Sequence, residues 1–151
     1  MSRVTMAEHA GFCYGVKRAV EMAEQAAASG KRCVMLGSLI HNDSVVRRLE
    51  SMGLTIVSRP EEVPEGATVI VRSHGEPKAV YEALHARGDI LDATCPNVSR
   101  IHKIVAQAEE TGRQPIIIGT PNHPEITAIA GWCAHPVVLA DAEELEKWLD
   151  K

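Results

Sequence analysis

A recurring local pattern constrains this chain more than any single residue does: a short β-branched run, a loop, and a helical stretch that ends at glycine. The apolar runs predict strands at 3–8, 32–36, 54–57, 68–72, 89–92, 115–118 and 136–139. The intervening stretches predict helices at 16–29, from a cap at 42–44 to 53, and at 77–87, 97–111 and 142–149. Strands that alternate with helices are typical of βαβ units. We therefore expect an α/β fold with a mostly parallel sheet.

The same pattern predicts how the chain is divided. Residues 1–95 contain a complete set of βα units, and residues 96–151 begin a second set. Continuous apolar runs such as 116–118 suit strands that are covered on both faces. The last helix, which begins at a capping box formed by Asp141 and Glu144, is followed by no strand. Because a βαβ unit normally returns to its sheet, we expect one complete small domain, an incomplete second one and a truncated chain.

Composition excludes several classes of function. The 16 basic and 20 acidic residues give a net charge of −4, which argues against a nucleic acid or an anionic membrane as partner. No apolar run approaches the roughly 20 residues that a membrane helix needs. The N-terminus lacks the apolar stretch of a signal peptide, so a cytoplasmic protein is expected. In that compartment the 4 cysteines are expected to be free thiols or metal ligands.

The residues most suited to chemistry share one place in the pattern. Each lies in a loop that leads from the end of a predicted strand into a helix, and they are Cys13, His41, His74, Cys95 and His123. The carboxyl ends of parallel strands lie along one edge of a sheet, where ligands bind. Helix N-termini at that edge add partial positive charge, which favours anions and thiolates. We therefore expect these five side chains to converge on one crevice.

Each cysteine also has a simpler explanation. Cys13 lies between Gly11 and Gly15, which permit close backbone approach to a bound group, yet an isolated thiol is usually a small buried hydrophobe. Cys95 precedes proline, as iron–sulfur ligands do, but proline also begins helices. Cys33, in a predicted strand, and Cys133 are expected to be core residues.

The histidines divide into those that follow predicted strands and those that have no such context. His41 precedes a helix cap, where a bound anion would favour it. His123 and Glu125, two positions apart, can direct a proton donor and a carboxyl group toward one pocket. The remaining histidines are expected to be surface or structural residues, and they are His9, His85, His102 and His135. The sequence has no zinc-type ligand spacing, no Walker motif and no Gly-x-Gly-x-x-Gly, so nucleotide binding is not favoured.

Five ordered motifs carry a resemblance to a known family. They are Gly11-Phe12-Cys13-Tyr14-Gly15-Val16, Ile40-His41-Asn42, Ser73-His74-Gly75, Asp92-Ala93-Thr94-Cys95-Pro96 and Asn122-His123-Pro124-Glu125. In this order and spacing, the chain resembles the N-terminal portion of the 4-hydroxy-3-methylbut-2-enyl diphosphate reductases, the LytB or IspH proteins. The resemblance extends over nearly the whole chain.

The resemblance implies an iron–sulfur oxidoreductase of the non-mevalonate isoprenoid pathway, built from three α/β domains. Its [4Fe–4S] cluster is held by three cysteines, which leaves one iron open to the substrate hydroxyl. Cys13 and Cys95 would be two of the cluster ligands. His41, His74 and His123 would line the diphosphate site, and Glu125, with His123 beside it, would deliver the proton that helps to expel water. The electron donor would be a ferredoxin or a flavodoxin, and the products isopentenyl and dimethylallyl diphosphate.

The same resemblance places the third cluster cysteine beyond residue 151, together with a threonine pair and a Ser/Asn group of the substrate pocket. This chain alone is then expected to be inactive. One alternative is a non-catalytic anion- or metal-binding module of the same fold. Another is a zinc hydrolase that uses Cys13, Cys95 and a histidine, which the absence of zinc-type spacing disfavours.

Overall fold

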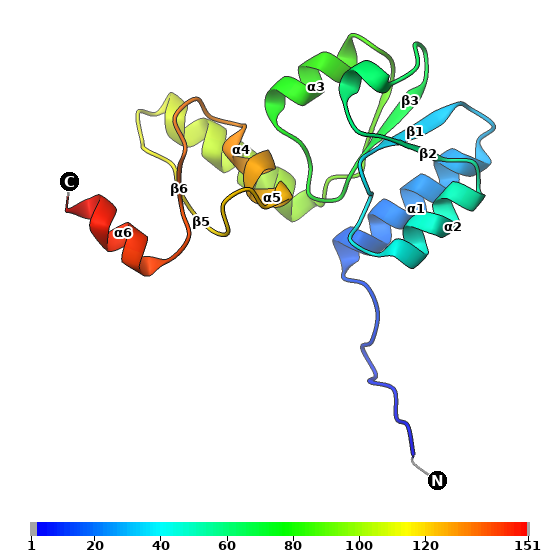
Figure 1. Ribbon diagram of the computed structural model, residues 1–151, viewed down its shortest axis with the longest axis horizontal. Coiled ribbons are helices and arrows are strands. Elements are labelled where there is room, and N and C mark those ends of the chain that lie inside the picture. The colour runs from blue at the N-terminus through cyan, green and yellow to red at the C-terminus, as the bar shows by residue number, and fades with distance from the viewer. Residues whose placement is uncertain (1–2, 151) are drawn as a thin grey trace.

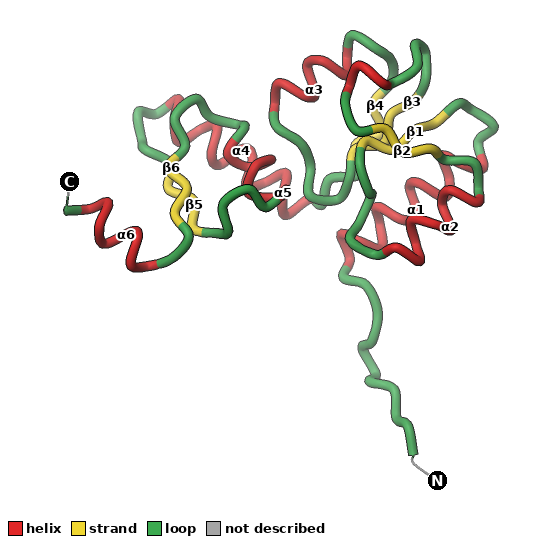
Figure 2. The backbone as a smooth tube through the Cα atoms, in the orientation of Figure 1, coloured by secondary structure: helices red, strands yellow, loops and turns green. Residues whose placement is uncertain are grey.

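The computed structural model describes residues 3–150 and contains two parallel sheets (Figures 1 and 2). The first sheet has the order β2-β1-β3-β4, with β1 at Cys33–Leu36, β2 at Thr55–Val57, β3 at Thr68–Val71 and β4 at Ile90–Asp92. The second pairs β5 at Ile116–Ile118 with β6 at Val137–Leu139. All pairs are parallel. The predicted α/β fold with mostly parallel sheets is confirmed.

Helices cover both faces of the first sheet (Figure 1). On one face lie α1 at Tyr14–Ala28 and α2 at Asp43–Ser51, and on the other lie α3 at Lys78–His85 and the short 3₁₀ helix η1 at Pro60–Glu62. The second sheet is accompanied by α4 at Pro96–Glu110, α5 at Pro124–Ala130 and α6 at Ala142–Leu149. None of the helices within residues 3–150 has the length and apolarity needed to cross a membrane.

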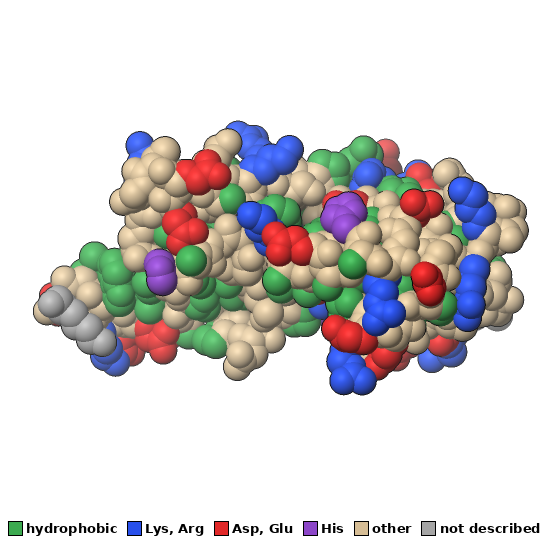
Figure 3. Space-filling model, turned by 90° about the horizontal axis from the view of Figure 1, so that it is seen from above, with side chains coloured by type: hydrophobic (Ala, Val, Ile, Leu, Met, Phe, Trp, Pro, Cys, Tyr) green, Lys and Arg blue, Asp and Glu red, His purple; other side chains and the backbone are tan. Residues whose placement is uncertain are grey.

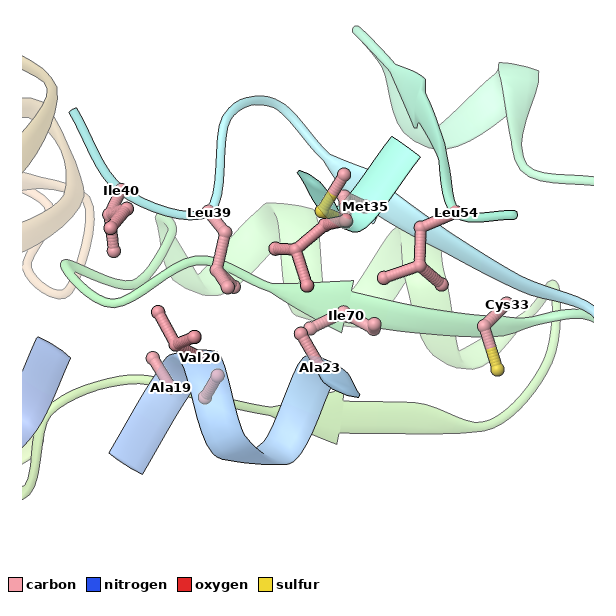
Figure 4. Close-up of a cluster of buried hydrophobic side chains, with 11 residues drawn as sticks. Ala19, Val20, Ala23, Cys33, Met35, Leu39, Ile40, Leu54 and Ile70 are labelled. Atoms are coloured by element: carbon pink, nitrogen blue, oxygen red, sulfur yellow. The ribbon is translucent and has the colours of Figure 1, made fainter. Parts of the chain in front are cut away.

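The strand residues alternate between the two cores of the first sheet. Met35 and Ile70, which are fully buried, face α1, where Ala19 and Ala23 allow close packing of the helix on the sheet (Figure 4). Their neighbours along the strands point the other way, into a second buried cluster that includes Leu84 of α3. Burial on both faces explains why these strands are continuous apolar runs. The core is aliphatic, and it fixes the positions at which the loops leave the sheet.

The strand predicted at 3–8 is wrong. Residues 3–13 form no strand, and the segment extends away from the sheet with Val4 and Met6 93% and 84% exposed (Figure 1). β1 is paired on both sides, and neither β2 nor β4 pairs with this segment within residues 3–150. A strand needs a neighbouring strand to satisfy its backbone groups, so an apolar alternation alone does not produce one.

The expectation that 116–118 is covered on both faces is also wrong. Ile117 is buried against Val105 of α4 and Ile129 of α5, but Ile116 and Ile118 are 39% and 52% exposed. Within the described part of the chain, therefore, the face of the β5–β6 sheet that carries Ile116 and Ile118 is only partly covered. The capping residue Asp141 is as predicted, because its Oδ1 accepts the Glu144 amide at 3.0 Å.

Candidate functional site

The order of the strands determines where a crevice forms. β1 and β3 are neighbours in the first sheet, and the helices that follow them, α2 and α3, lie on opposite faces. A parallel sheet opens at such a switch point, outside the carboxyl ends of its strands. The loops that leave β1 and β3 there carry His41 and His74, and the loop after β4 carries Cys95.

A cavity of about 400 Å³ occupies this edge. All six residues predicted from the sequence line it, and they are Cys13, His41, His74, Cys95, His123 and Glu125. The first sheet and its helices contribute most of the wall, while His123 and Glu125 come from the start of α5. Apolar side chains, among them Val16, Ile40 and Val98, complete the wall. The cavity therefore combines thiols, imidazoles and one carboxyl group in a partly apolar setting.

Both thiols occupy the same position on a helix. Cys13 is the N-cap of α1 and Cys95 the N-cap of α4, each a helix of 15 residues. Neither side chain makes a capping hydrogen bond, so both sulfur atoms are available to a ligand. The helix N-termini carry partial positive charge and unsatisfied amide groups, which stabilise an anionic sulfur or a bound anion.

Gly15 allows the two N-termini to approach each other. A Cβ at this buried glycine would lie 2.5 Å from Sγ and 2.9 Å from Cβ of Cys95, closer than real Cβ atoms come to such neighbours. Cys95 therefore packs on the first turn of α1, two residues from Cys13. Its own amide donates to the Ser73 carbonyl at 2.8 Å, which ties the Cys95 loop to the His74 loop.

A hydrogen-bond network that the sequence did not predict fixes Thr94, the residue before Cys95. The buried Thr94 donates its amide and its hydroxyl to Asp92 Oδ1, at 3.0 and 2.5 Å. The Tyr81 hydroxyl lies 3.0 Å from Thr94 Oγ1, and Arg18 Nη1 donates to the Thr94 carbonyl at 3.1 Å. Burial raises the pKa of Tyr81 well above its usual value, so its hydroxyl keeps its proton.

The three imidazoles lie next to one another. The ring centroids of His41 and His74 are 5.4 Å apart with 13° between the planes, and those of His41 and His123 are 6.2 Å apart with 56° between them. His41 and His123 are exposed, whereas His74 is only 6% exposed. The cluster thus presents two accessible rings above a buried one.

His74 is held in its neutral form. Burial, followed by the charge of Arg72 and the neighbouring His41, lowers its pKa from 6.5 to about 4. Arg72 Nε lies 2.5 Å from Oε1 of the buried Glu76, and these two residues form an ion pair on either side of His74 in the chain. Neither ring nitrogen of His74 has a hydrogen-bond partner among the described residues. A buried imidazole with both nitrogens unsatisfied is a group that a ligand would stabilise.

His123 has one nitrogen engaged and one available. It is the N-cap of α5, and its Nδ1 accepts the Glu125 amide at 3.2 Å. An accepting Nδ1 carries no proton, so in the neutral ring the proton sits on Nε2. The ring can therefore donate from Nε2 while Nδ1 holds the helix start, which also carries the half-buried Glu125.

The other cysteines and histidines lie elsewhere. Cys33 is buried in the sheet core as predicted, and Cys133, partly buried after α5, does not line the cavity. His9, His85 and His135 are exposed, and His102 is a buried structural residue that stacks on Trp132. No group of three or more metal-binding side chains in a ready ligand arrangement occurs within residues 3–150.

The surface carries no large patch of one charge on the face shown in Figure 3. Lys and Arg side chains alternate there with Asp and Glu side chains over both sheets. This agrees with the net charge of −4.

Comparison with known proteins gives one consistent family. The model of the LytB protein family matches residues 4–151. A 4-hydroxy-3-methylbut-2-enyl diphosphate reductase of Caldanaerobacter subterraneus is 39% identical over 146 residues, which cover 93% of this chain and 51% of that protein. The reductase of Aquifex aeolicus is 43% identical over 134 residues, 87% of this chain and 46% of that protein. The chain thus spans about half the length of the curated relatives it matches.

Solved structures agree with the sequence matches. A structure of (E)-4-hydroxy-3-methyl-but-2-enyl diphosphate reductase, described as the terminal enzyme of the non-mevalonate pathway, aligns with a TM-score of 0.82 at 39% identity. The match covers 98% of this chain and 54% of that one. The E-1-hydroxy-2-methyl-but-2-enyl-4-diphosphate reductase of Plasmodium falciparum aligns with a TM-score of 0.85 at 28% identity, over 93% of this chain and 45% of that one.

Proposed function

Because this chain belongs to the LytB protein family, we propose that it is the N-terminal portion of an enzyme that reduces 4-hydroxy-3-methylbut-2-enyl diphosphate to isopentenyl and dimethylallyl diphosphate. The observation that carries the proposal is the shared cavity, which brings two helix-capping thiols, three imidazoles and Glu125 to one edge of the first sheet. The names of the relatives support the substrate and the pathway.

The two cysteines that line the cavity fit two of the ligands of an iron–sulfur cluster. Cys13 and Cys95 would each contribute one thiolate, because both line the cavity and Cys95 packs on Gly15 in the first turn of α1. No other cysteine within residues 3–150 lines the cavity, so a third thiolate would have to come from elsewhere. When bound, a [4Fe–4S] cluster with one open iron supplies electrons and a Lewis acid for the substrate hydroxyl.

The imidazoles would bind the diphosphate. His41 and His123 are accessible, and the available Nε2–H of His123 can donate to a phosphate oxygen. The buried His74 offers two unsatisfied ring nitrogens next to them. An anion beside the buried His74 would favour the protonated form of that ring, because a nearby negative charge raises the pKa of an imidazole. The N-termini of α1 and α4 add favourable partial charge.

Glu125 would deliver the proton that helps to expel the substrate hydroxyl as water. The overall reaction takes up two electrons and two protons, breaks the carbon–oxygen bond to the hydroxyl, forms a carbon–hydrogen bond and releases water. Within residues 3–150, Glu125 is the one carboxyl group that lines the cavity, and its backbone amide donates to Nδ1 of His123. A carboxyl group near a bound diphosphate retains its proton more readily, as a general acid must. The electrons would come from an external ferredoxin or flavodoxin.

Anaerobic reconstitution tests the ligand assignment. Incubation of the chain with iron and sulfide is expected to give a brown species with visible charge-transfer absorption, and Cys13→Ser or Cys95→Ser should abolish it. Cys33→Ser and Cys133→Ser are matched controls, because neither thiol lines the cavity, and they should leave the absorption unchanged. Equal absorption in all four variants would overturn the assignment.

A second candidate is a non-catalytic anion-binding module. The observation that favours it is that only two thiols line the cavity within residues 3–150, while all three predicted histidines lie there next to one another. This candidate predicts that pyrophosphate binds whereas no cluster forms under the conditions above. The reductase proposal instead predicts that a cluster does form under those conditions, and that a polypeptide of the relatives' full length that contains this chain reduces the substrate. The chain by itself is expected to show no turnover.

A further inference from the structure

Trp132 connects the two sheets at the level of the candidate site. This partly buried residue follows α5, and its indole Nε1–H donates to the backbone carbonyl of Glu76 at 3.0 Å. Glu76 lies two residues after His74, in the loop that leaves β3. The contact joins residues that are 56 positions apart in the chain, and it directly links the second sheet's helix to the His74 loop.

Aromatic contacts hold the indole in place. The ring stacks on His102 of α4, with centroids 5.1 Å apart and 16° between the planes. Tyr81 of α3 lies on it at a tilt, 5.8 Å away. Aromatic pairs at these distances are favourable beyond the area they bury. The indole is therefore fixed between a helix of the first sheet and a helix of the second.

The neighbouring backbone makes a second connection between the same two segments. The Lys78 amide donates to the Gly131 carbonyl at 3.2 Å. A Cβ at Gly131 would collide with Pro77, so a side chain at this position would separate the segments. Residues 131–132 and 76–78 thus form a clamp between the end of α5 and the loop after β3; we call it the Trp132 clamp.

The clamp lies at one end of α5, and site residues lie at the other. α5 has only 7 residues, and it carries His123 as its N-cap and Glu125 in its first turn. A helix this short transmits a displacement of one end to the other. Because the clamp fixes α5 on the loop that carries His74, it also fixes the distance from His123 to His41 and His74.

We propose that Trp132 is a positioning residue that holds His123 and Glu125 against the His41–His74 pair. The consequence for anion binding rests on the proposed function of the three histidines. The placement of His123 does not rest on the proposed function, because it follows from the contacts of the Trp132 clamp.

Trp132→Phe tests the proposal, because it keeps an aromatic ring but removes the N–H donor. The expected results are altered ring NMR signals of His123 with those of His41 nearly unchanged, and pyrophosphate binding weaker by roughly fivefold, the equivalent of one lost hydrogen bond. Gly131→Ala should move the same signals. Trp148→Phe, in the half-buried tryptophan of α6, is the matched control and should change neither the signals nor the binding.

The outcomes separate this proposal from the function on which it builds. Unchanged His123 signals in both Trp132→Phe and Gly131→Ala, with the proteins folded by circular dichroism, would overturn the positioning role. If the parent chain does not bind pyrophosphate but the His123 signals still move in the variants, the positioning role stands and the anion site fails. A loss of binding without movement of the His123 signals would also contradict the proposal.

Discussion

The imidazoles of His41 and His74 lie nearly parallel, with ring centroids 5.4 Å apart, although they follow different strands, β1 and β3. Burial and the charge of Arg72 lower the pKa of His74 most, and the neighbouring His41 lowers it further, so a positive charge on both rings is unfavourable without a counterion. The pair therefore suits an anion that would bring its own negative charge. This relationship gives the candidate site a pH dependence that can be measured.

Pyrophosphate should stabilise the chain, and more so at about pH 6 than at about pH 8, because imidazolium binds the anion better than neutral imidazole does. The melting temperature with and without pyrophosphate is the measurement. His41→Gln and His123→Gln should reduce the shift, whereas His85→Gln, in an exposed residue of α3 outside the cavity, should not. The same shift at both pH values would show that the histidines do not take up protons on binding.

His74 should make the free protein sensitive to acid. The unfolded chain takes up a proton on this residue near pH 6.5, but the folded protein does so only near pH 4. The contribution of His74 to the free energy of unfolding should thus be fully present above pH 6.5, and it should be lost as the pH drops toward 4. A difference of this size corresponds to about 3 kcal/mol at full protonation. Urea unfolding across this interval is the measurement.

His74→Gln provides the comparison for that titration. The variant lacks the buried imidazole, so its free energy of unfolding should decline less steeply between pH 6.5 and 4 than that of the parent. Other groups that titrate in this range are common to both proteins and cancel in the difference. Parallel curves for the two proteins would mean that His74 titrates normally.

Gly15→Ala should disturb Cys95 although it replaces none of the six predicted site residues. The added Cβ would lie 2.5 Å from Cys95 Sγ, and overpacking of this kind costs about 1–3 kcal/mol of stability. The rate of Cys95 alkylation, measured by mass spectrometry, should rise. Gly112→Ala is the control, because its backbone is left-handed at φ +72° but nothing lies within 4 Å. It should lose stability without altering the rate; equal rates in both variants would contradict the packing of Cys95 on α1.

Tyr81→Phe should loosen the Cys95 loop. The variant loses the hydroxyl that lies 3.0 Å from Thr94 Oγ1, and a hydrogen bond of this kind contributes about 1 kcal/mol. Faster alkylation of Cys95 and a lower urea midpoint are expected. Tyr14→Phe, in a side chain that is 73% exposed, is the matched control and should change neither quantity. An unchanged alkylation rate in Tyr81→Phe would show that the network does not restrain the loop.

Local patterns predicted most of the fold, and one general rule predicted the site. The runs that became β1 and β3 are apolar because nearly all of their residues are buried, and the glycines after helices mark where helices end. The convergence of His41, His74 and Cys95 follows from the common edge of β1, β3 and β4, whereas Cys13 follows no strand and His123 follows β5 of the second sheet. That rule needs only the order of elements, so it operates without knowledge of side-chain contacts.

The errors have a common physical origin. Whether 3–8 forms a strand depends on a partner strand, and whether Ile116 and Ile118 are covered depends on which helices reach that face. Likewise, Trp132 carries no local signal for its contact with Glu76, which lies 56 positions away. Non-local contacts of this kind leave no periodicity in the sequence, and the three-dimensional structure is needed to identify them.

The central claim is that Cys13 and Cys95 face one cavity, and cross-linking in solution tests it most directly. In a Cys33→Ser/Cys133→Ser background, a short bismaleimide should join the two remaining thiols within one chain, and mass spectrometry should detect the linked peptides. Gly15→Ala should lower the yield. Single modification of both thiols without any intramolecular cross-link would contradict the claim.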